Sequence, residues 1–254
     1  MPDLIVEKSM SDNWLSNTWL VGDKVSGKAV IIDTGGPTQP IMARLEELKL
    51  DVTHVLCTHH HIDHVAHNDE FKQKFGCPVC GGGQERKWFE KLKADLDVEL
   101  TGDEVIQTGG LNIRTLHIPG HTSGQLAFVI NEERVFTGDT LFKDSVGGTR
   151  GPDHTTFEDL HHSIMDVLMK LPPEMEVHPG HMQSTTIARA WEENAFVRAW
   201  RGADPVKETS CTAFGAPAKL LLRAPDYDGG TKCWVRFEEG GKLDMVPGSK
   251  VQEL

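Results

Sequence analysis

Histidine and aspartate cluster in one short stretch of the chain, CTHHHIDHVAH, from Cys57 to His67. Within it, the pattern His59-x-His61-x-Asp63-His64 places four potential metal ligands in six residues. His59 and His61 lie two apart just after an apolar stretch, so in extended chain their side chains point to the same side and can bind one ion. Asp63 and His64 lie where the chain turns toward a helix, so they could hold a second ion. A solvated polar loop is a poor explanation for so many ligands.

Further candidate ligands lie in glycine-containing turns that follow predicted strands. His121 is in IPGHTSG, Asp139 in FTGDTLF and His181 in VHPGHM. Glycine lets the backbone approach closely at such turns. Alone, His121 or His181 would more often be a surface or structural residue. Together with the cluster they favour a dinuclear site, because each catalytic ion needs several protein ligands and an open position. Imidazole and carboxylate suit zinc, iron and manganese alike, so the ligands do not identify the metal.

The motifs THHHIDH, GHTSG, FTGDTLF and PGH, in this order and rough spacing, resemble the signature of the metallo-β-lactamase superfamily over about residues 5–202. With Asp63 and His64 both present, the set looks most like the glyoxalase II (hydroxyacylglutathione hydrolase) branch. The resemblance implies an αββα four-layer sandwich with the metals at one edge of the two sheets. It also implies a ligand assignment: His59, His61 and His121 for the first ion, Asp63, His64 and His181 for the second, and Asp139 bridging both. Asp33, in VIIDTGG, matches a family aspartate that supports the site without ligating.

The implied activity is metal-dependent hydrolysis of an ester-like bond, a thioester, lactone or similar, in a hydroxyacylglutathione hydrolase-like or lactonase-like enzyme. Two divalent ions, zinc before iron or manganese, would lower the pKa of a water so that it attacks a carbonyl carbon as hydroxide. Asp63 is the candidate catalytic residue, because it could orient the hydroxide or move its proton. Lys143 and Arg150 are candidate contacts to a carboxylate of a small-molecule substrate, although solvated surface cations are an equally good interpretation.

Two other classes of function compete with this hypothesis. The superfamily includes mononuclear-iron persulfide dioxygenases, which keep the same motif background, and metal content separates them from a two-metal hydrolase. It also includes nucleases, but a formal net charge of −12 disfavours general affinity for nucleic acid or anionic membranes. No apolar stretch is long enough to span a membrane. The N-terminus lacks a secretory signal pattern, so the five cysteines are expected to be reduced in a cytoplasmic protein.

The elements that must position these residues predict a mixed α/β fold. The turn-prone GDKVSGK predicts a hairpin that ends in the strand Ala29–Ile32, and residues 51–58 predict a short buried strand that ends at the histidine cluster. From residue 104 to residue 142, short strands alternate with turns. Apolar residues at helical spacing predict helices over residues 37–50, 64–75, 84–96, 155–171 and 185–202.

From about Thr209 the pattern changes to short apolar stretches separated by DGG and EEGG turns, which is typical of β-hairpins. We therefore predict a metal hydrolase domain over residues 1–205 and a small β-rich module over residues 209–254. Common glyoxalase II enzymes carry a helical segment here instead, so glutathione is not assigned. Because Tyr227, the only tyrosine, lies in this tail, no tyrosine contact is expected in the main pocket. The module either covers the mouth of the site or mediates self-association into a homo-oligomer, and the sequence leaves both open.

Overall fold

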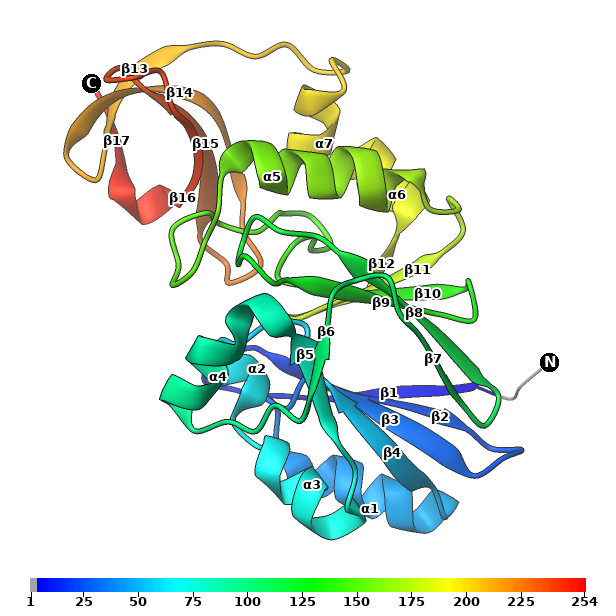
Figure 1. Cartoon of the computed structure of the whole chain (residues 1–254). Coiled ribbons are helices and arrows are strands. Elements are labelled where there is room, and N and C mark those ends of the chain that lie inside the picture. The colour runs from blue at the N-terminus through cyan, green and yellow to red at the C-terminus, as the bar shows by residue number, and fades with distance from the viewer. Residues whose placement is uncertain (1–3) are drawn as a thin grey trace. The chain divides into compact units, whose positions relative to one another are not determined.

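The computed structural model describes residues 4–254 and consists of two compact units, whose elements are labelled in Figure 1. The first unit contains the described residues through His117, together with Gly124–Gly138 and His178–Met182. The second unit contains Ile118–Ser123, Asp139–Val177 and Gln183–Leu254. No helix among residues 4–254 is long and apolar enough to cross a membrane.

A six-stranded sheet with the order β1-β2-β3-β4-β5-β6 lies in the first unit. Its strands are β1 Leu4–Met10, β2 Asn17–Asp23, β3 Lys28–Ile32, β4 Asp51–Leu56, β5 Val79–Gly82 and β6 Val98–Leu100. The first three strands pair antiparallel, and β3 to β6 pair parallel. Most residues of β3 and β5 are buried, as expected for parallel strands that are covered on both faces. The predicted hairpin and the strand before the histidine cluster are confirmed.

Three helices pack on one face of this sheet: α1 (Thr38–Leu48), α3 (Asn68–Phe75) and α4 (Arg86–Leu92) (Figure 1). Their apolar side chains, among them Leu45, Phe71 and Phe89, form one core with sheet residues such as Ile31 and Val55. The single helix expected over residues 64–75 is wrong, because α2 (Ile62–Val65) and α3 are separate. The amide of His67 donates to Thr34 Oγ1, which interrupts the helix between them. The helix expected over residues 84–96 is shorter, because a 3₁₀ turn, η1 (Gly83–Glu85), precedes α4 and Lys93 ends it in the left-handed conformation.

The first unit also contains four strands of a second, six-stranded sheet, and these four pair antiparallel in the order β10-β9-β8-β7. They are β7 Val105–Thr108, β8 Leu111–His117, β9 Leu126–Ile130 and β10 Arg134–Gly138. This sheet packs against the first one through a core that includes Trp19, Ile32, Leu56, Phe128 and Phe136. Two packed sheets with helices on the outer face confirm the predicted α/β sandwich.

The second unit contains the helices of the later chain, α5 (Phe157–His162), α6 (Ile187–Glu193) and α7 (Ala195–Trp200). The turns η2 (Ser163–Val167) and η3 (Leu168–Lys170) continue α5. The short strand β12 (Thr185–Thr186) pairs antiparallel with the first two residues of β11 (Glu176–Pro179), whose last two residues belong to the first unit. The single helix expected over residues 185–202 is wrong. Asn194 adopts an extended conformation, and its Oδ1 accepts hydrogen bonds from the amides of Phe196 and Val197, which starts a new helix.

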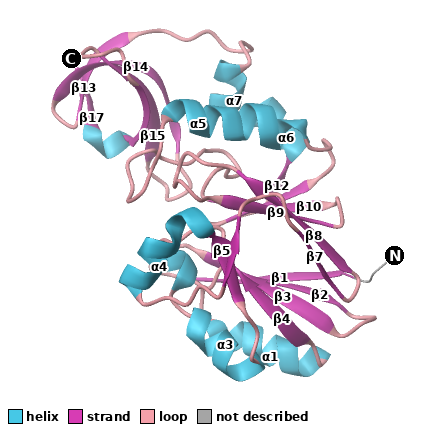
Figure 2. Cartoon of the chain, viewed as in Figure 1, coloured by secondary structure: helices cyan, strands magenta, loops and turns pink. Residues whose placement is uncertain are grey.

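The last segment of the second unit is a five-stranded antiparallel sheet with the order β16-β15-β14-β13-β17, and Figure 2 shows its curved strands. Its strands are β13 Thr209–Ala213, β14 Ala216–Pro225, β15 Thr231–Phe237, β16 Leu243–Pro247 and β17 Val251–Glu253, with the turn η4 (Gly248–Lys250) before the last. The predicted β structure of this segment is confirmed. The division into domains at residues 205 and 209 stays a prediction.

The five cysteines are free and buried. Burial raises the pKa of the Cys80 thiol to about 12 and that of the Cys233 thiol to about 11. Burial and the nearby Asp33 carboxylate also raise the pKa of the Cys57 thiol well above its usual value. None of these three thiols is therefore suited to act as a thiolate nucleophile.

His178 at the end of β11 is buried in the first unit against two aromatic rings. Its ring stacks on Phe136, with the centroids 4.7 Å apart, and lies edge-on to Trp19 at 4.8 Å. Burial, with Arg134 and Lys8 nearby, lowers its pKa from 6.5 to about 3. The folded protein keeps this imidazole neutral over a pH range in which the unfolded chain protonates it. This difference in protonation therefore lowers the free energy of unfolding as the pH falls from about 6.5 toward 3, and it has no effect above about 6.5.

The wild type should lose more free energy of unfolding between pH 7.5 and pH 5 than the variant His178→Phe, by about 2 kcal/mol. Phenylalanine keeps the aromatic packing and does not titrate. Urea denaturation at a series of pH values measures this. His162→Phe is the matched control, because the His162 side chain is 66% exposed. Equal pH dependence in the wild type and His178→Phe would contradict the assignment.

Candidate metal centre

The parallel strands of the first unit bring polar residues to one edge of the sheet. Asp33 directly follows β3, the histidine cluster follows β4, and Glu85 lies shortly after β5. Carboxyl ends of parallel strands meet at the same edge, which is where open α/β sheets place their sites. Five of the seven candidate ligands lie in this unit, and the other two, His121 and Asp139, lie in the second unit.

Asp33 holds the histidine loop through three hydrogen bonds. Its Oδ1 accepts the amide of Thr58 at 2.7 Å, and its Oδ2 accepts Thr58 Oγ1 at 2.8 Å and His64 Nδ1 at 2.9 Å. Because His64 donates its Nδ1–H to this buried carboxylate, its Nε2 keeps a lone pair, as a metal ligand requires. Asp33 has a φ of 54°, a left-handed conformation that costs a non-glycine residue on the order of 1 kcal/mol or more. Asp33 thus contacts the candidate ligand His64 directly, as the family resemblance implies for a supporting residue.

His64, His181 and Asp63 converge on one point in the first unit. The Nε2 atoms of His64 and His181 lie 3.3 Å apart, and Asp63 Oδ2 lies 3.6 Å from the first and 3.5 Å from the second. Tetrahedral zinc with bonds of about 2.0–2.1 Å separates its ligand atoms by about 3.3 Å. The spacing of these three atoms therefore fits a divalent ion.

His59 and His61 converge in the same way. His59 Nε2 lies 3.0 Å from His61 Nδ1. The other nitrogen of His59, Nδ1, lies 3.0 Å from Thr58 Oγ1, whose own proton goes to Asp33. His59 therefore donates from Nδ1 and presents the lone pair of Nε2 toward His61, which is a suitable arrangement for a second ion.

Two glycines allow the close approach of chain segments around these ligands. A Cβ on Gly35 would lie 1.6 Å from the carbonyl oxygen of Asp63. A Cβ on Gly138 would lie 2.5 Å from Thr58 Oγ1, and the φ of Gly138 is 48°. The end of β10 can therefore lie directly against the residue that precedes His59 only because glycine occupies position 138.

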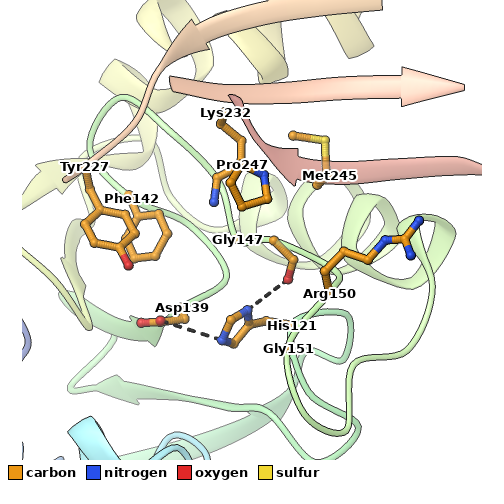
Figure 3. Close-up of a pocket in the computed structure, with 11 residues that line it drawn as sticks. His121, Asp139, Phe142, Gly147, Arg150, Gly151, Tyr227, Lys232, Met245 and Pro247 are labelled. Carbon is orange, nitrogen blue, oxygen red and sulfur yellow. Dashed lines mark hydrogen bonds and ion pairs between the residues drawn. The ribbon is translucent and has the colours of Figure 1, made fainter. Parts of the chain in front are cut away.

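In the second unit, His121 and Asp139 face one another (Figure 3). His121 Nδ1 donates to the carbonyl oxygen of Gly148 at 2.9 Å, so its Nε2 keeps the lone pair and points to Asp139 Oδ2 at 3.7 Å. Both residues line a pocket of about 230 Å³ that Tyr227 also lines. The expectation of no tyrosine contact in the main pocket is therefore wrong, because the chain brings Tyr227 back to this pocket from far along the sequence.

The two candidate substrate contacts differ in position. Arg150 lines the pocket of the second unit, and its Nε lies 2.6 Å from Asp244 Oδ2. Lys143 is partly buried and is not among the described residues that line this pocket. A role for either residue in substrate binding stays a prediction.

Glu85 is a residue that the sequence did not single out. Its fully buried carboxylate accepts the amide of His60 at 2.7 Å, His60 Nδ1 at 3.0 Å and the amide of Gly124 at 3.1 Å. His60 also stacks on Trp88 with the ring centroids 5.1 Å apart. Glu85 thus ties the histidine loop to the start of the segment that leads into β9. No sequence signal separates it from the other charged residues of QERKWFEKL.

Known proteins are similar to this chain in sequence and in structure. The family model of the metallo-β-lactamase superfamily matches residues 12–181. Hydroxyacylglutathione hydrolase GloC of Haemophilus influenzae is 35% identical over 185 residues, which cover 66% of this chain and 87% of that protein. The probable polyketide biosynthesis zinc-dependent hydrolase BaeB of Bacillus velezensis is 29% identical over 176 residues, which cover 68% of this chain and 76% of BaeB. The crystal structure of ETHE1 from Myxococcus xanthus is similar with a TM-score of 0.67 and 26% identity, over 79% of this chain and 92% of that chain. The chain belongs to the metallo-β-lactamase superfamily.

Proposed function

We propose that the chain, a hydrolase of the metallo-β-lactamase superfamily, uses two divalent metal ions to cleave an ester-like bond such as a thioester or lactone. One observation carries the proposal: the convergence of His64 Nε2, His181 Nε2 and Asp63 Oδ2 at 3.3 to 3.6 Å. An identity of 35% to a hydroxyacylglutathione hydrolase supports a thioester, and BaeB, a zinc-dependent hydrolase by name, supports zinc over iron or manganese.

In this proposal the ligands divide into three sets: His59, His61 and His121 for one ion, Asp63, His64 and His181 for the other, and Asp139 as the bridge. The positions of His121 and Asp139 along the chain support their inclusion in the metal site, although both belong to the second unit. Asp139 follows Gly138 by a single peptide bond, and Gly138 packs against Thr58. His121 lies three residues before Gly124, which belongs to the first unit.

The ions, when bound, would activate the attacking water and polarise the substrate carbonyl. Asp33 keeps His64 in its ligating tautomer, and Gly148 does the same for His121. Asp63 exposes 24% of its side chain, whereas His64 and His181 expose 2% or less. Its carboxylate is therefore the member of this group best able to take a proton from an incoming water, which is why we assign it the catalytic role.

The proposed substrate is a small molecule with a carbonyl group, and the proposed location is the cytoplasm, in keeping with five free thiols. The test combines metal analysis of the purified protein with a panel of thioesters, lactones and β-lactams. We expect about two ions per chain and turnover of a thioester or lactone. A protein that carries two ions and hydrolyses no member of the panel would overturn the proposal.

A mononuclear-iron persulfide dioxygenase is the second candidate, and the similarity to the ETHE1 structure supports it. This alternative requires the same histidines to bind fewer metal ions. One iron per chain together with oxygen uptake on a persulfide would establish it in place of the hydrolase.

A further inference from the structure

We propose that the C-terminal sheet forms a wall of the substrate pocket and makes the enzyme selective for a compact, uncharged acyl group. This inference rests on the proposed function, because the pocket holds substrate only if His121 and Asp139 belong to the metal site. It goes beyond that function by assigning a role to residues 209–254.

The pocket lies entirely within the second unit and has a volume of about 230 Å³ (Figure 3). His121 and Asp139 occupy one side of it. The C-terminal strands and turns supply four other lining residues: Tyr227, Lys232, Met245 and Pro247. A substrate group in this pocket would therefore touch the C-terminal sheet while its carbonyl lies next to the candidate ligands.

Hydrogen bonds fix this sheet to the loop that follows Asp139. The amide of Thr149 donates to the carbonyl oxygen of Met245 at 3.1 Å, and the amide of Met245 donates to Thr149 Oγ1 at 3.1 Å. Ser145 Oγ donates to Asp226 Oδ1 at 2.8 Å. The pocket wall is thus attached at two places to the loop that begins at Asp139, and its side chains are held in fixed positions relative to that residue.

Both cations of the pocket are already paired with carboxylates of the same chain. Lys232 Nζ lies 3.0 Å from Asp226 Oδ2, and both side chains are at least nine-tenths buried. Arg150 is bonded to Asp244, which is also buried. An anionic substrate group would have to compete with these two carboxylates, and the buried Asp226 would repel it in a setting that screens charge poorly. The pocket therefore favours a neutral group.

The size of the pocket limits that group. The pocket volume of about 230 Å³ is roughly seven to eight times the volume that one water molecule occupies in the liquid. This volume is smaller than that of sites that bind drug-sized molecules. The rings of Phe142 and Tyr227, with centroids 4.5 Å apart, close one side (Figure 3). A short acyl chain fits this space better than a long one.

The charge argument is tested with butyryl and succinyl thioesters of one leaving group, N-acetylcysteamine. The wild type should favour butyryl by at least about tenfold in kcat/KM. Asp226→Asn leaves Lys232 without its partner and should reduce that preference by about tenfold or more. The double variant Asp226→Asn/Lys232→Met removes both charges and should restore the preference. A wild type that favours succinyl, or a folded Asp226→Asn with the wild-type preference, overturns the inference.

The size argument uses a second variant, which does not disturb a buried charge. Tyr227→Ala should shift the preferred acyl chain to a greater length in a series from acetyl to decanoyl. Lys219→Met, on the same sheet and outside the pocket lining, should keep the wild-type optimum. An unchanged optimum in Tyr227→Ala overturns the assignment of the pocket wall.

A binding measurement separates this inference from the proposed function. Calorimetry with butyramide and succinamate needs no turnover. If the wild type hydrolyses nothing but binds butyramide over succinamate, and Asp226→Asn loses that difference, the pocket assignment holds and the hydrolase proposal fails. If hydrolysis occurs and the variants keep the wild-type selectivity, the pocket assignment fails and the hydrolase proposal holds.

Discussion

Replacing Asp139 with alanine should lower kcat/KM by about 100- to 1,000-fold and should reduce the metal content below two ions per chain. The Asp139 side chain is 7% exposed, and its Oδ2 points to His121 Nε2 at 3.7 Å. As the proposed bridge, this carboxylate contributes to both ions, so its loss removes a ligand from each. The single substitution should therefore affect metal binding and turnover together.

Metal analysis and steady-state kinetics on the best substrate measure these effects. Asp144→Ala is the matched control, because Asp144 lies on the same loop, is half exposed and bonds to Arg189 instead. It should retain wild-type metal content and turnover. A folded Asp139→Ala protein with two ions and wild-type turnover would refute the bridging assignment.

The part of the site that could be predicted from sequence is the part that local geometry specifies. A spacing of two residues after a strand aligns His59 and His61, and the turn into α2 brings Asp63 and His64 together, whereas their distant partner His181 was implied by the family resemblance. These relations depend on strand and helix periodicity, which a single sequence shows. The strands that carry them were predicted for the same reason.

The contacts that sequence reasoning missed are nonlocal. Tyr227 lies 88 residues after Asp139, and nothing in the intervening pattern indicates that both line one pocket. Glu85 is buried because its partners are an amide and a ring from the histidine loop. The break at Asn194 follows from a side chain that caps the next helix and donates to the carbonyl oxygen of Ser145. In each case a tertiary partner, rather than the local sequence, decides the outcome.

Asp33→Asn should raise the metal concentration needed for half-maximal activity by about 10- to 100-fold, with a much smaller change in kcat at saturating metal. Asparagine tolerates the left-handed backbone of this position, so the substitution adds little strain. Its amide, however, can donate a hydrogen bond to His64 Nδ1 where the carboxylate accepts one. The imidazole would then carry its proton on Nε2, which is the atom that must bind the ion.

Titration of metal-free protein with zinc, followed by activity and by calorimetry, measures this shift. Asp51→Asn serves as the control, because the Asp51 side chain is 58% exposed at the start of β4 and bonds to Lys28. A purely structural role for Asp33 would lower the melting temperature and kcat but would leave the zinc midpoint unchanged. A displaced midpoint with a recovered kcat instead indicates that the carboxylate acts on the metal through the tautomer of His64, as its three hydrogen bonds imply.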